Sequence, residues 1–234
     1  MRISAYLSRA GYASRREAER LIEDRLVYIN GKNIDTPVAF VEEGDFVRVG
    51  SKQIKLQESK LWMYNKPKGE MVGVANELDI KTGKVSVFDN VKKFITSRHI
   101  IPIGRLDINS EGLLLFTNDG NIAQQMMQPK NNYARKYVVK VVGDKKGFDK
   151  LKEYAINGVI IAGIKYKSFK IKLSKKNNSD SKYFWYEITL FEGKNREVRK
   201  IFTYVGLKVL RLIRIQFGKY RLGNLASGEV VKID

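Results

Sequence analysis

The stretch IIPIGRLDINSEGLLLFTNDG, residues 100–120, determines much of the fold of this chain. Its run GLLLFT (112–117) is continuously apolar and predicts a buried strand, while NDG (118–120) predicts a turn into a helix. Between two apolar runs lies one carboxylate, Asp107, and burying such a charge is costly unless a cation pairs with it. Two interpretations of Asp107 remain open: an aspartate that forms a turn or cap, and a carboxylate held in a reactive site.

Outward from this stretch, residues 59–234 alternate short strands with helices. Since few βαβ units occur, we predict an α+β fold with a mainly antiparallel mixed sheet flanked by helices. The segment 164–173 changes phase at Ser168, where a bulge would place four lysines on one solvated face. We expect residues 172–182 to form an exposed basic loop. Predicted strands lie within 61–69, 112–117, 136–143, 164–173, 183–191 and 208–218, predicted helices within 122–128, 147–158 and 195–206, and the four lysines are Lys165, Lys167, Lys170 and Lys172.

The first 58 residues predict a separate small domain of two helices and a short sheet. Ser14 and Glu17 form a capping-box pattern at the start of the second helix. Asn30-Gly31, between two apolar runs, predicts a tight type I′ hairpin turn. The polar stretch SKQIKLQESK (51–60) is interpreted as a linker, which gives domains of residues 1–58 and 59–234.

Charge indicates the class of partner. The chain has 44 Lys and Arg against 25 Asp and Glu, a net charge of +19. Almost all of this surplus belongs to residues 59–234, and it points to nucleic acid or an anionic membrane. No secretory signal or membrane-spanning run occurs, so we expect a soluble, cytoplasmic protein.

The residue inventory also limits the chemistry. No cysteine and one histidine, His99, exclude disulfides, thiol nucleophiles, cysteine-ligated metals and a Ser-His-Asp triad within one chain. No phosphate-binding glycine motif occurs. Catalysis would therefore rest on carboxylate, Tyr, Lys, Arg or hydroxyl groups.

The run SRAGYASRREAERLIEDRLVYINGK, residues 8–32, resembles the S4-type RNA-binding domain. The resemblance implies that five basic side chains face RNA phosphates. The alternative from the residues alone is that these charges only solvate a helix face. The five are Arg9, Arg15, Arg16, Arg20 and Lys32.

Four further blocks resemble bacterial rRNA pseudouridine synthases that carry an N-terminal S4-type domain. NREVR and RLIRIQFG are more similar to the large-subunit (23S) branch, although the chain ends at Asp234 without the long basic tail common there. The small-subunit (16S) branch is the alternative. The blocks are NKPKG (65–69), GRLDINSEGLLLFTNDG (104–120), RKYVVKV (135–141) and EGKNREVRKIFTYVG (192–206) followed by RLIRIQFG (211–218).

The resemblance implies that a uridine, flipped out of an rRNA stem-loop, is isomerised without cofactor or metal. Asp107 would act at the ribose, by attack on C1′ or by removal of the C2′ proton. Tyr137 would stack on the base, Arg199 would pair with Asp107, Arg105 would hold the place of the flipped nucleotide, and Lys66 would support the pocket and contact RNA. The expected partner is rRNA, free or in an assembly intermediate, and the expected state is a monomer.

Two other classes of function fit the charge. One is a non-catalytic rRNA-binding or ribosome-assembly factor. The other, a basic membrane-surface protein, is disfavoured because no long amphipathic basic helix occurs.

Overall fold

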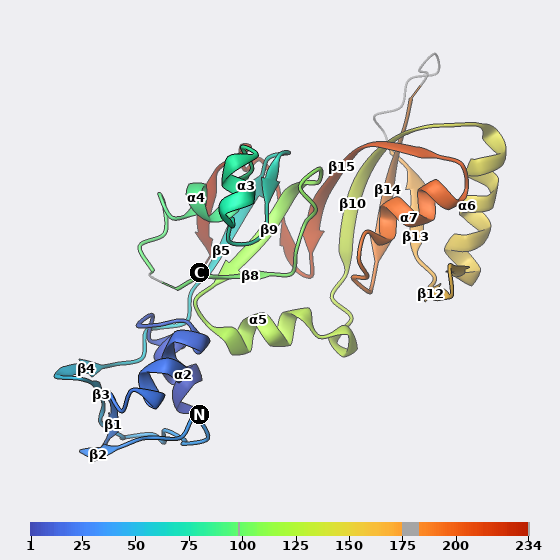
Figure 1. Ribbon diagram of the computed structural model, residues 1–234. Coiled ribbons are helices and arrows are strands. Elements are labelled where there is room, and N and C mark those ends of the chain that lie inside the picture. Colours follow the sequence, from blue (N-terminus) through green and yellow to red (C-terminus); the bar gives the residue numbers. More distant parts are fainter. Residues whose placement is uncertain (98, 175–182, 234) are drawn as a thin grey trace.

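The strand predicted at residues 112–117 lies inside a nine-stranded sheet (Figure 1). The structure, a computed structural model, describes residues 1–97, 99–174 and 183–233. Seven strands run in the order β13-β14-β10-β15-β9-β5-β17, with β16 beside β15 and β8 beside β9. Among the strands of this sheet within the described residues, only β15 and β9 pair in parallel, so the predicted α+β class with a mainly antiparallel sheet is confirmed. The strands are β5 Leu61–Lys66, β8 Ile101–Ile103, β9 Glu111–Thr117, β10 Arg135–Val142, β13 Lys170–Leu173, β14 Phe184–Leu190, β15 Lys208–Phe217, β16 Tyr220–Arg221 and β17 Val230–Ile233.

The middle of strand β9, residues 113–116, is continuously apolar because both faces of the sheet are covered at this point. Leu114 and Phe116 belong to the main core, which helices α4, α6 and α7 help to close. Leu113 and Leu115, on the opposite face, pack in a second core with α5. Alternate side chains of a strand point to opposite faces, so the continuous apolar run serves two cores at once.

Short helices and two small ribbons complete the larger part of the chain. Each helix starts where the sequence places a capping side chain or turn; Asp119, for example, accepts a hydrogen bond from the Asn121 N–H at the start of α5. The helices are α3 Glu77–Lys81, α4 Val87–Val91, α5 Gly120–Met127, α6 Lys145–Asn157 and α7 Glu197–Tyr204, with a 3₁₀ turn at Pro129–Asn131. The ribbons pair β6 Glu70–Met71 with β7 Val85–Ser86 and β11 Val159–Ile161 with β12 Ile164–Tyr166.

Residues 1–54, here called the N-terminal unit, have a hydrophobic core of their own. The predicted capping box of Ser14 and Glu17 is present at α2, and Asn30-Gly31 takes the positive φ angles of a type I′ turn. The sheet order is β2-β1-β3-β4. The elements are α1 Ile3–Arg9, α2 Arg15–Glu23, β1 Val27–Ile29, β2 Lys32–Asn33, β3 Val47–Val49 and β4 Lys52–Ile54.

Two sequence predictions are wrong. The segment 164–173 is not one bulged strand: β12 and β13 belong to different sheets, and Phe169 is buried between them. The stretch 51–60 is not wholly a linker, since Lys52–Ile54 pair with β3 as strand β4 and only residues 55–60 lack regular structure. A short strand with one buried residue, Ile54, carries too little pattern to be recognised. Residues 175–182 of the predicted basic loop lie outside the described residues.

Candidate functional site

Asp107 lies on the loop that joins β8 to β9, on the wall of a cleft of about 700 Å³. The loop is held from two sides. The Ser110 N–H donates to the Asp107 carbonyl, and the Gly69 N–H, in the turn after β5, donates to the Ile108 carbonyl. The Asp107 side chain is 28% exposed, so it is open to a ligand in the cleft yet partly shielded from water.

Two arginines from the start of α7 approach the Asp107 carboxylate. Arg196 Nη1 lies 3.2 Å from Oδ2, and Arg199 Nε lies 3.7 Å from the same atom. Arg199 Nη2 also donates to the Asn109 carbonyl at 2.7 Å. Burial lowers the pKa of Arg199, and the negative charge of Asp107 opposes this shift. The two guanidinium groups place positive charge directly beside the carboxylate.

Tyr137 lines the same cleft from β10. Its ring is buried, and its register partner on β15 is Arg214. Asp107, Tyr137 and Arg199 were predicted from blocks far apart in the sequence. Asp107 and Tyr137 line one cleft, and Arg199 reaches that carboxylate from the same helix end as Arg196.

Arg105 and Lys66 differ in their exposure to solvent. Arg105 is exposed on the rim of the cleft. Lys66 is completely buried, and its ammonium donates to the carbonyls of Pro67 and Ser110. Burial lowers the pKa of Lys66 to about 8, against the opposing charges of Glu70, Glu111 and Asp107. The predicted RNA contact of Lys66 is therefore not available to this side chain; it joins β5 to the Asp107 loop instead.

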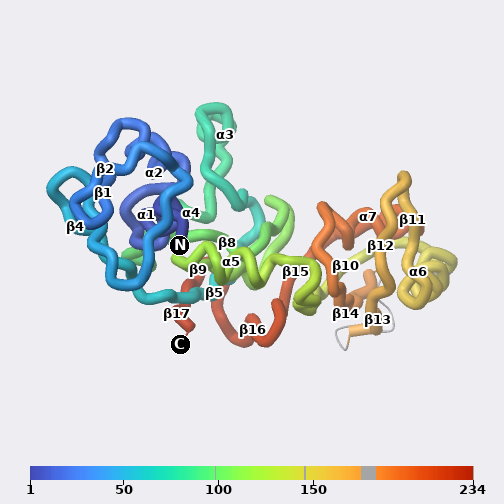
Figure 2. Tube along the Cα trace, turned by 90° about the horizontal axis from the view of Figure 1, so that it is seen from below, coloured from blue at the N-terminus to red at the C-terminus, as the bar shows by residue number. Residues whose placement is uncertain are grey.

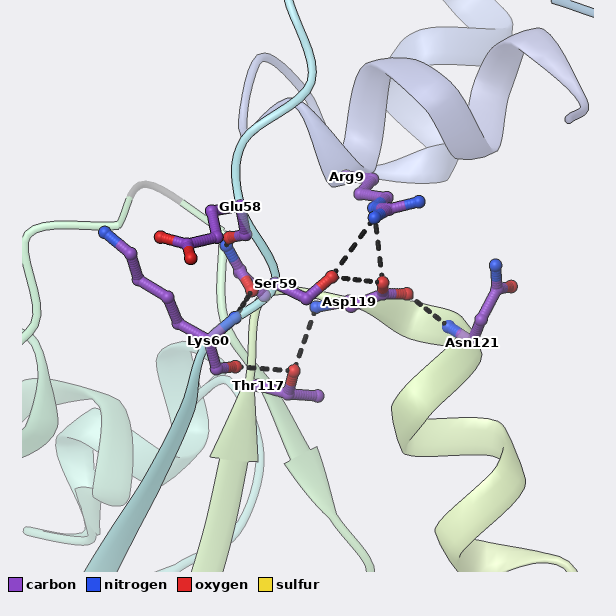
Figure 3. Close-up of polar contacts among 8 residues, drawn as sticks. Arg9, Glu58, Ser59, Lys60, Thr117, Asp119 and Asn121 are labelled. Atoms are coloured by element: carbon purple, nitrogen blue, oxygen red, sulfur yellow. Dashed lines mark hydrogen bonds and ion pairs between the residues drawn. The ribbon is translucent and has the colours of Figure 1, made fainter. Parts of the chain in front are cut away.

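The basic residues of the N-terminal unit that were predicted to face RNA also fall into two groups. Arg15, Arg16 and Arg20 on α2 and Lys32 on β2 are exposed. Arg9 is not directed at solvent: its guanidinium forms an ion pair with Asp119, at 3.2 Å, and donates to Ser59 Oγ (Figure 3). Its charge is used within the chain, so the prediction that Arg9 faces RNA phosphates does not match its position.

Several buried charged residues in the cleft wall were not identified from the sequence: Arg135, Glu197 and Arg214. Arg214 Nε donates to the Leu113 carbonyl, while its Nη2 has no hydrogen-bond partner. A Cβ on Gly112 would lie 2.3 Å from the Arg214 carbonyl oxygen, so only glycine lets β15 approach β9 this closely. The sequence did contain a signal for Arg214, because in the strand RLIRIQF this arginine occupies a buried position.

Two carboxyl groups face each other beneath the start of α7. The pKa of Glu197 is raised to about 8, first by burial and then by neighbouring Glu192. Burial acts to raise the pKa of Glu192 as well, but the Lys194 side chain and the Lys167 N–H lower it overall. Glu197 therefore keeps a proton at neutral pH while Glu192 is ionised.

This pair predicts a pH-dependent stability. In the folded protein Glu197 keeps its proton up to about pH 8, whereas in the unfolded chain it loses the proton near the ordinary pKa of a glutamate. The free energy of unfolding therefore falls as the pH rises from the unfolded pKa to the folded pKa. We expect Glu197→Gln to reduce this fall by about 1–3 kcal/mol. Urea unfolding at several pH values between about 5.5 and 8.5 measures the slope. Glu153→Gln, on the exposed face of α6, is the matched control, and equal slopes in wild type and Glu197→Gln would contradict the prediction.

No cluster of three or more His, Asp or Glu side chains in ranges 1–97, 99–174 and 183–233 is arranged to hold a metal ion. Over the same ranges, none of the helices is both long and apolar enough to cross a bilayer.

Comparison with known proteins places this geometry in context. The sequence profile described as RNA pseudouridylate synthase matches residues 60–204, and the S4 domain profile matches residues 1–47. An uncharacterised RNA pseudouridine synthase of Rickettsia typhi is 40% identical, over 99% of this chain and 91% of the relative. The ribosomal large subunit pseudouridine synthase B of Haemophilus influenzae is 34% identical, over 94% of this chain and 61% of the relative. A crystal structure of a pseudouridylate synthase has the same fold, with a TM-score of 0.64 at 21% identity, over 100% of this chain and 96% of the other.

Proposed function

Because the chain belongs to the RNA pseudouridylate synthase family, and is therefore an isomerase acting on RNA, we propose that it converts uridine to pseudouridine in 23S ribosomal RNA. The observation that carries the proposal is the Asp107 carboxylate, which lies in a cleft with two guanidinium groups beside it and Tyr137 on the same wall. The relative from Haemophilus influenzae, named for the large ribosomal subunit, favours 23S over 16S rRNA.

The reaction needs little besides a well-placed carboxylate. The N1–C1′ bond of uridine breaks, the uracil rotates, a C5–C1′ bond forms, the C5 proton leaves and N1 gains a proton. Positive charge develops at C1′ as the first bond weakens, and an ionised carboxylate stabilises it, as in glycoside cleavage. Whether Asp107 attacks C1′ or takes the C2′ proton, it acts as a carboxylate, and Arg196 and Arg199 place positive charge beside that group.

We propose that the Tyr137 ring contacts the uracil base. Its ring is held by β10, in register with Arg214 on β15 and Ile188 on β14, so it offers a rigid aromatic surface. An extruded uracil stacks on such a surface, and the nearby phenol oxygen can assist loss of the C5 proton. Arg105, exposed at the cleft rim, is placed to occupy the space that the flipped nucleotide leaves in its stem.

The S4 domain supplies affinity. Arg15, Arg16 and Arg20 are exposed on one short helix, and each phosphate contact contributes a salt-dependent gain. We expect the triple change of these arginines to Ala to weaken rRNA binding by about tenfold or more at moderate salt. The single-turnover rate at saturating enzyme should change little, because none of the three lines the Asp107 cleft. A collapse of that rate would contradict the assignment, and the variant should also show a shallower salt dependence of binding.

We further propose that the two domains divide near residue 58, within the irregular segment 55–60, and that one chain acts alone in the cytoplasm. A single chain supplies every cleft residue described above.

The substrate assignment is tested by mapping pseudouridines in ribosomal RNA from cells with and without this protein. We expect one or a few positions of 23S rRNA to revert to uridine, while 16S rRNA is unchanged. Restoration by the wild-type chain completes the test. Loss of a 16S position alone would place the enzyme in the small-subunit branch.

A further inference from the structure

We propose that a groove along helix α5 carries the RNA strand that runs from the S4 domain to the Asp107 cleft. The proposal deepens the proposed function, on which it rests, by assigning a path to the RNA on the enzyme surface. The groove has a volume of about 470 Å³ and is lined at one end by Arg15 of α2. At the other end Met127 lines both this groove and the catalytic cleft, so the two hollows adjoin at this side chain.

The two domains are joined by a polar contact at the entrance to the groove. Asp119 Oδ2 accepts from Ser59 Oγ at 2.7 Å and pairs with Arg9, which belongs to α1 (Figure 3). Asp119 Oδ1 accepts from the Asn121 N–H and so caps α5. The clamp of Arg9, Ser59 and Asp119 thus connects α1, the linker and the start of α5. Arg9, which an unclamped S4 domain would present to RNA, fixes the domain instead.

The end of the linker beside this clamp, residues 58–60, is held by hydrogen bonds. The Lys60 N–H donates to Asn118 Oδ1, the Asn118 amide donates to the Glu58 carbonyl, and Thr117 Oγ1 donates to the Lys60 carbonyl (Figure 3). The segment is tied by its backbone at Glu58 and Lys60 and by the side chain of Ser59 between them, so it has little freedom to swing. The position of α2 relative to α5 is therefore defined, and both views place α5 between the N-terminal unit and strands β10 and β15 (Figures 1 and 2).

The groove follows one stripe of α5. Its lining residues recur three or four positions apart, which is the spacing of neighbours on one helix face. They are Gly120, Ala123, Gln124, Met127 and Gln128. The eight residues of α5 span about 12 Å, a length that about three or four stacked nucleotides cover.

The lining chemistry fits a nucleotide strand. The guanidinium of Arg15 suits a phosphate, the amides of Gln124 and Gln128 can donate to and accept from base edges and sugars, and Met127 offers an apolar surface to a base. The chain carries a net charge of +19, so a polyanion is the favoured occupant of a groove that opens beside exposed arginines.

The test compares binding of two labelled RNA probes to the full-length protein: a hairpin with a single-stranded tail of about ten nucleotides, and the same hairpin without it. Tails on the 5′ and 3′ ends are tried separately. The double variant Gln124→Glu with Gln128→Glu places negative charge in the groove, and glutamate has nearly the helix propensity of glutamine. The single variant Gln124→Glu is also measured, and its matched control is Gln125→Glu, which adds one negative charge at an exposed position of the same helix outside the groove.

We expect wild type to bind one tailed hairpin more tightly than the bare hairpin. The double variant should lose about tenfold in affinity for that tailed RNA and much less for the bare hairpin, and Gln125→Glu should change either by less than about twofold. Three results would each overturn the proposed RNA path. They are an equal loss of affinity in Gln124→Glu and Gln125→Glu, no loss of affinity in the double variant, and no gain of affinity from a tail at either end in wild type. Binding does not depend on turnover. Failure of wild type to form pseudouridine in 23S rRNA would therefore refute the proposed function separately.

Discussion

Asp107→Asn is expected to abolish pseudouridine formation while RNA binding remains near wild type. The substitution keeps the size and polarity of the side chain but removes the charge that stabilises C1′ and the oxygen that would attack or take a proton. Loss of such a group typically costs about 10⁴-fold or more in rate. Tritium released from RNA labelled at uridine C5, measured in a single turnover, reports the step directly. Filter binding with the same RNA reports affinity.

The matched control is Asp149→Asn, on α6. Asp149 pairs with Lys152 on an exposed helix face, so this variant has the same change of net charge far from the cleft. We expect it to retain full activity. Asp107 is 28% exposed, and Arg199 also donates to the Asn109 carbonyl, so neutralising Asp107 should not unfold the protein; circular dichroism measures this. Product accumulating at the wild-type rate in Asp107→Asn would refute the assignment of the reactive carboxylate.

Much of this fold could be predicted from local patterns, for a physical reason. A capping box at Ser14, an Asn-Gly turn at residue 30 and an apolar stripe on α7 each act over a few residues, and the structure contains all of them. The error at Ser168 shows the limit of such patterns. A phase change in the apolar pattern can indicate a bulge or a break between sheets, and only the pairing partners of β12 and β13 distinguish the two.

The site was only partly predictable because its energetics depend on contacts between distant segments. The local sequence does not distinguish Lys66 from a surface lysine, yet its side chain is completely buried and its ammonium donates to two carbonyls. Arg9 reads as an RNA ligand, yet it meets a carboxylate 110 positions later in the chain. Glu197 stands between two arginines in sequence, but Glu192 and burial decide its protonation. Charge alone does not reveal whether a cation meets solvent, a carbonyl or a carboxylate.

The second large effect is expected from Arg199→Met, compared with Arg196→Met. Arg196 is the nearer of the two to Asp107, at 3.2 Å against 3.7 Å, but its side chain is 49% exposed and that of Arg199 only 14%. Water and salt screen the exposed pair, which is typically worth about 0.2–1 kcal/mol. The shielded cation acts through a lower dielectric and also holds the Asn109 carbonyl of the Asp107 loop. Burial therefore outweighs the half-ångström difference in distance.

We expect Arg199→Met to lower the single-turnover rate by about 100-fold to 1,000-fold, and Arg196→Met by less than about tenfold. Methionine retains much of the apolar length of arginine, so packing of α7 should survive in both. Rates are measured at saturating enzyme and at two salt concentrations. Raising the salt should also slow wild type slightly and narrow its difference from Arg196→Met, because screening removes the exposed pair's contribution. The lower single-turnover rate of Arg199→Met should persist at the higher salt concentration. If Arg196→Met proved the slower enzyme, distance rather than shielding would decide which guanidinium interacts more strongly with the Asp107 carboxylate, and Arg196 would take the role assigned to Arg199.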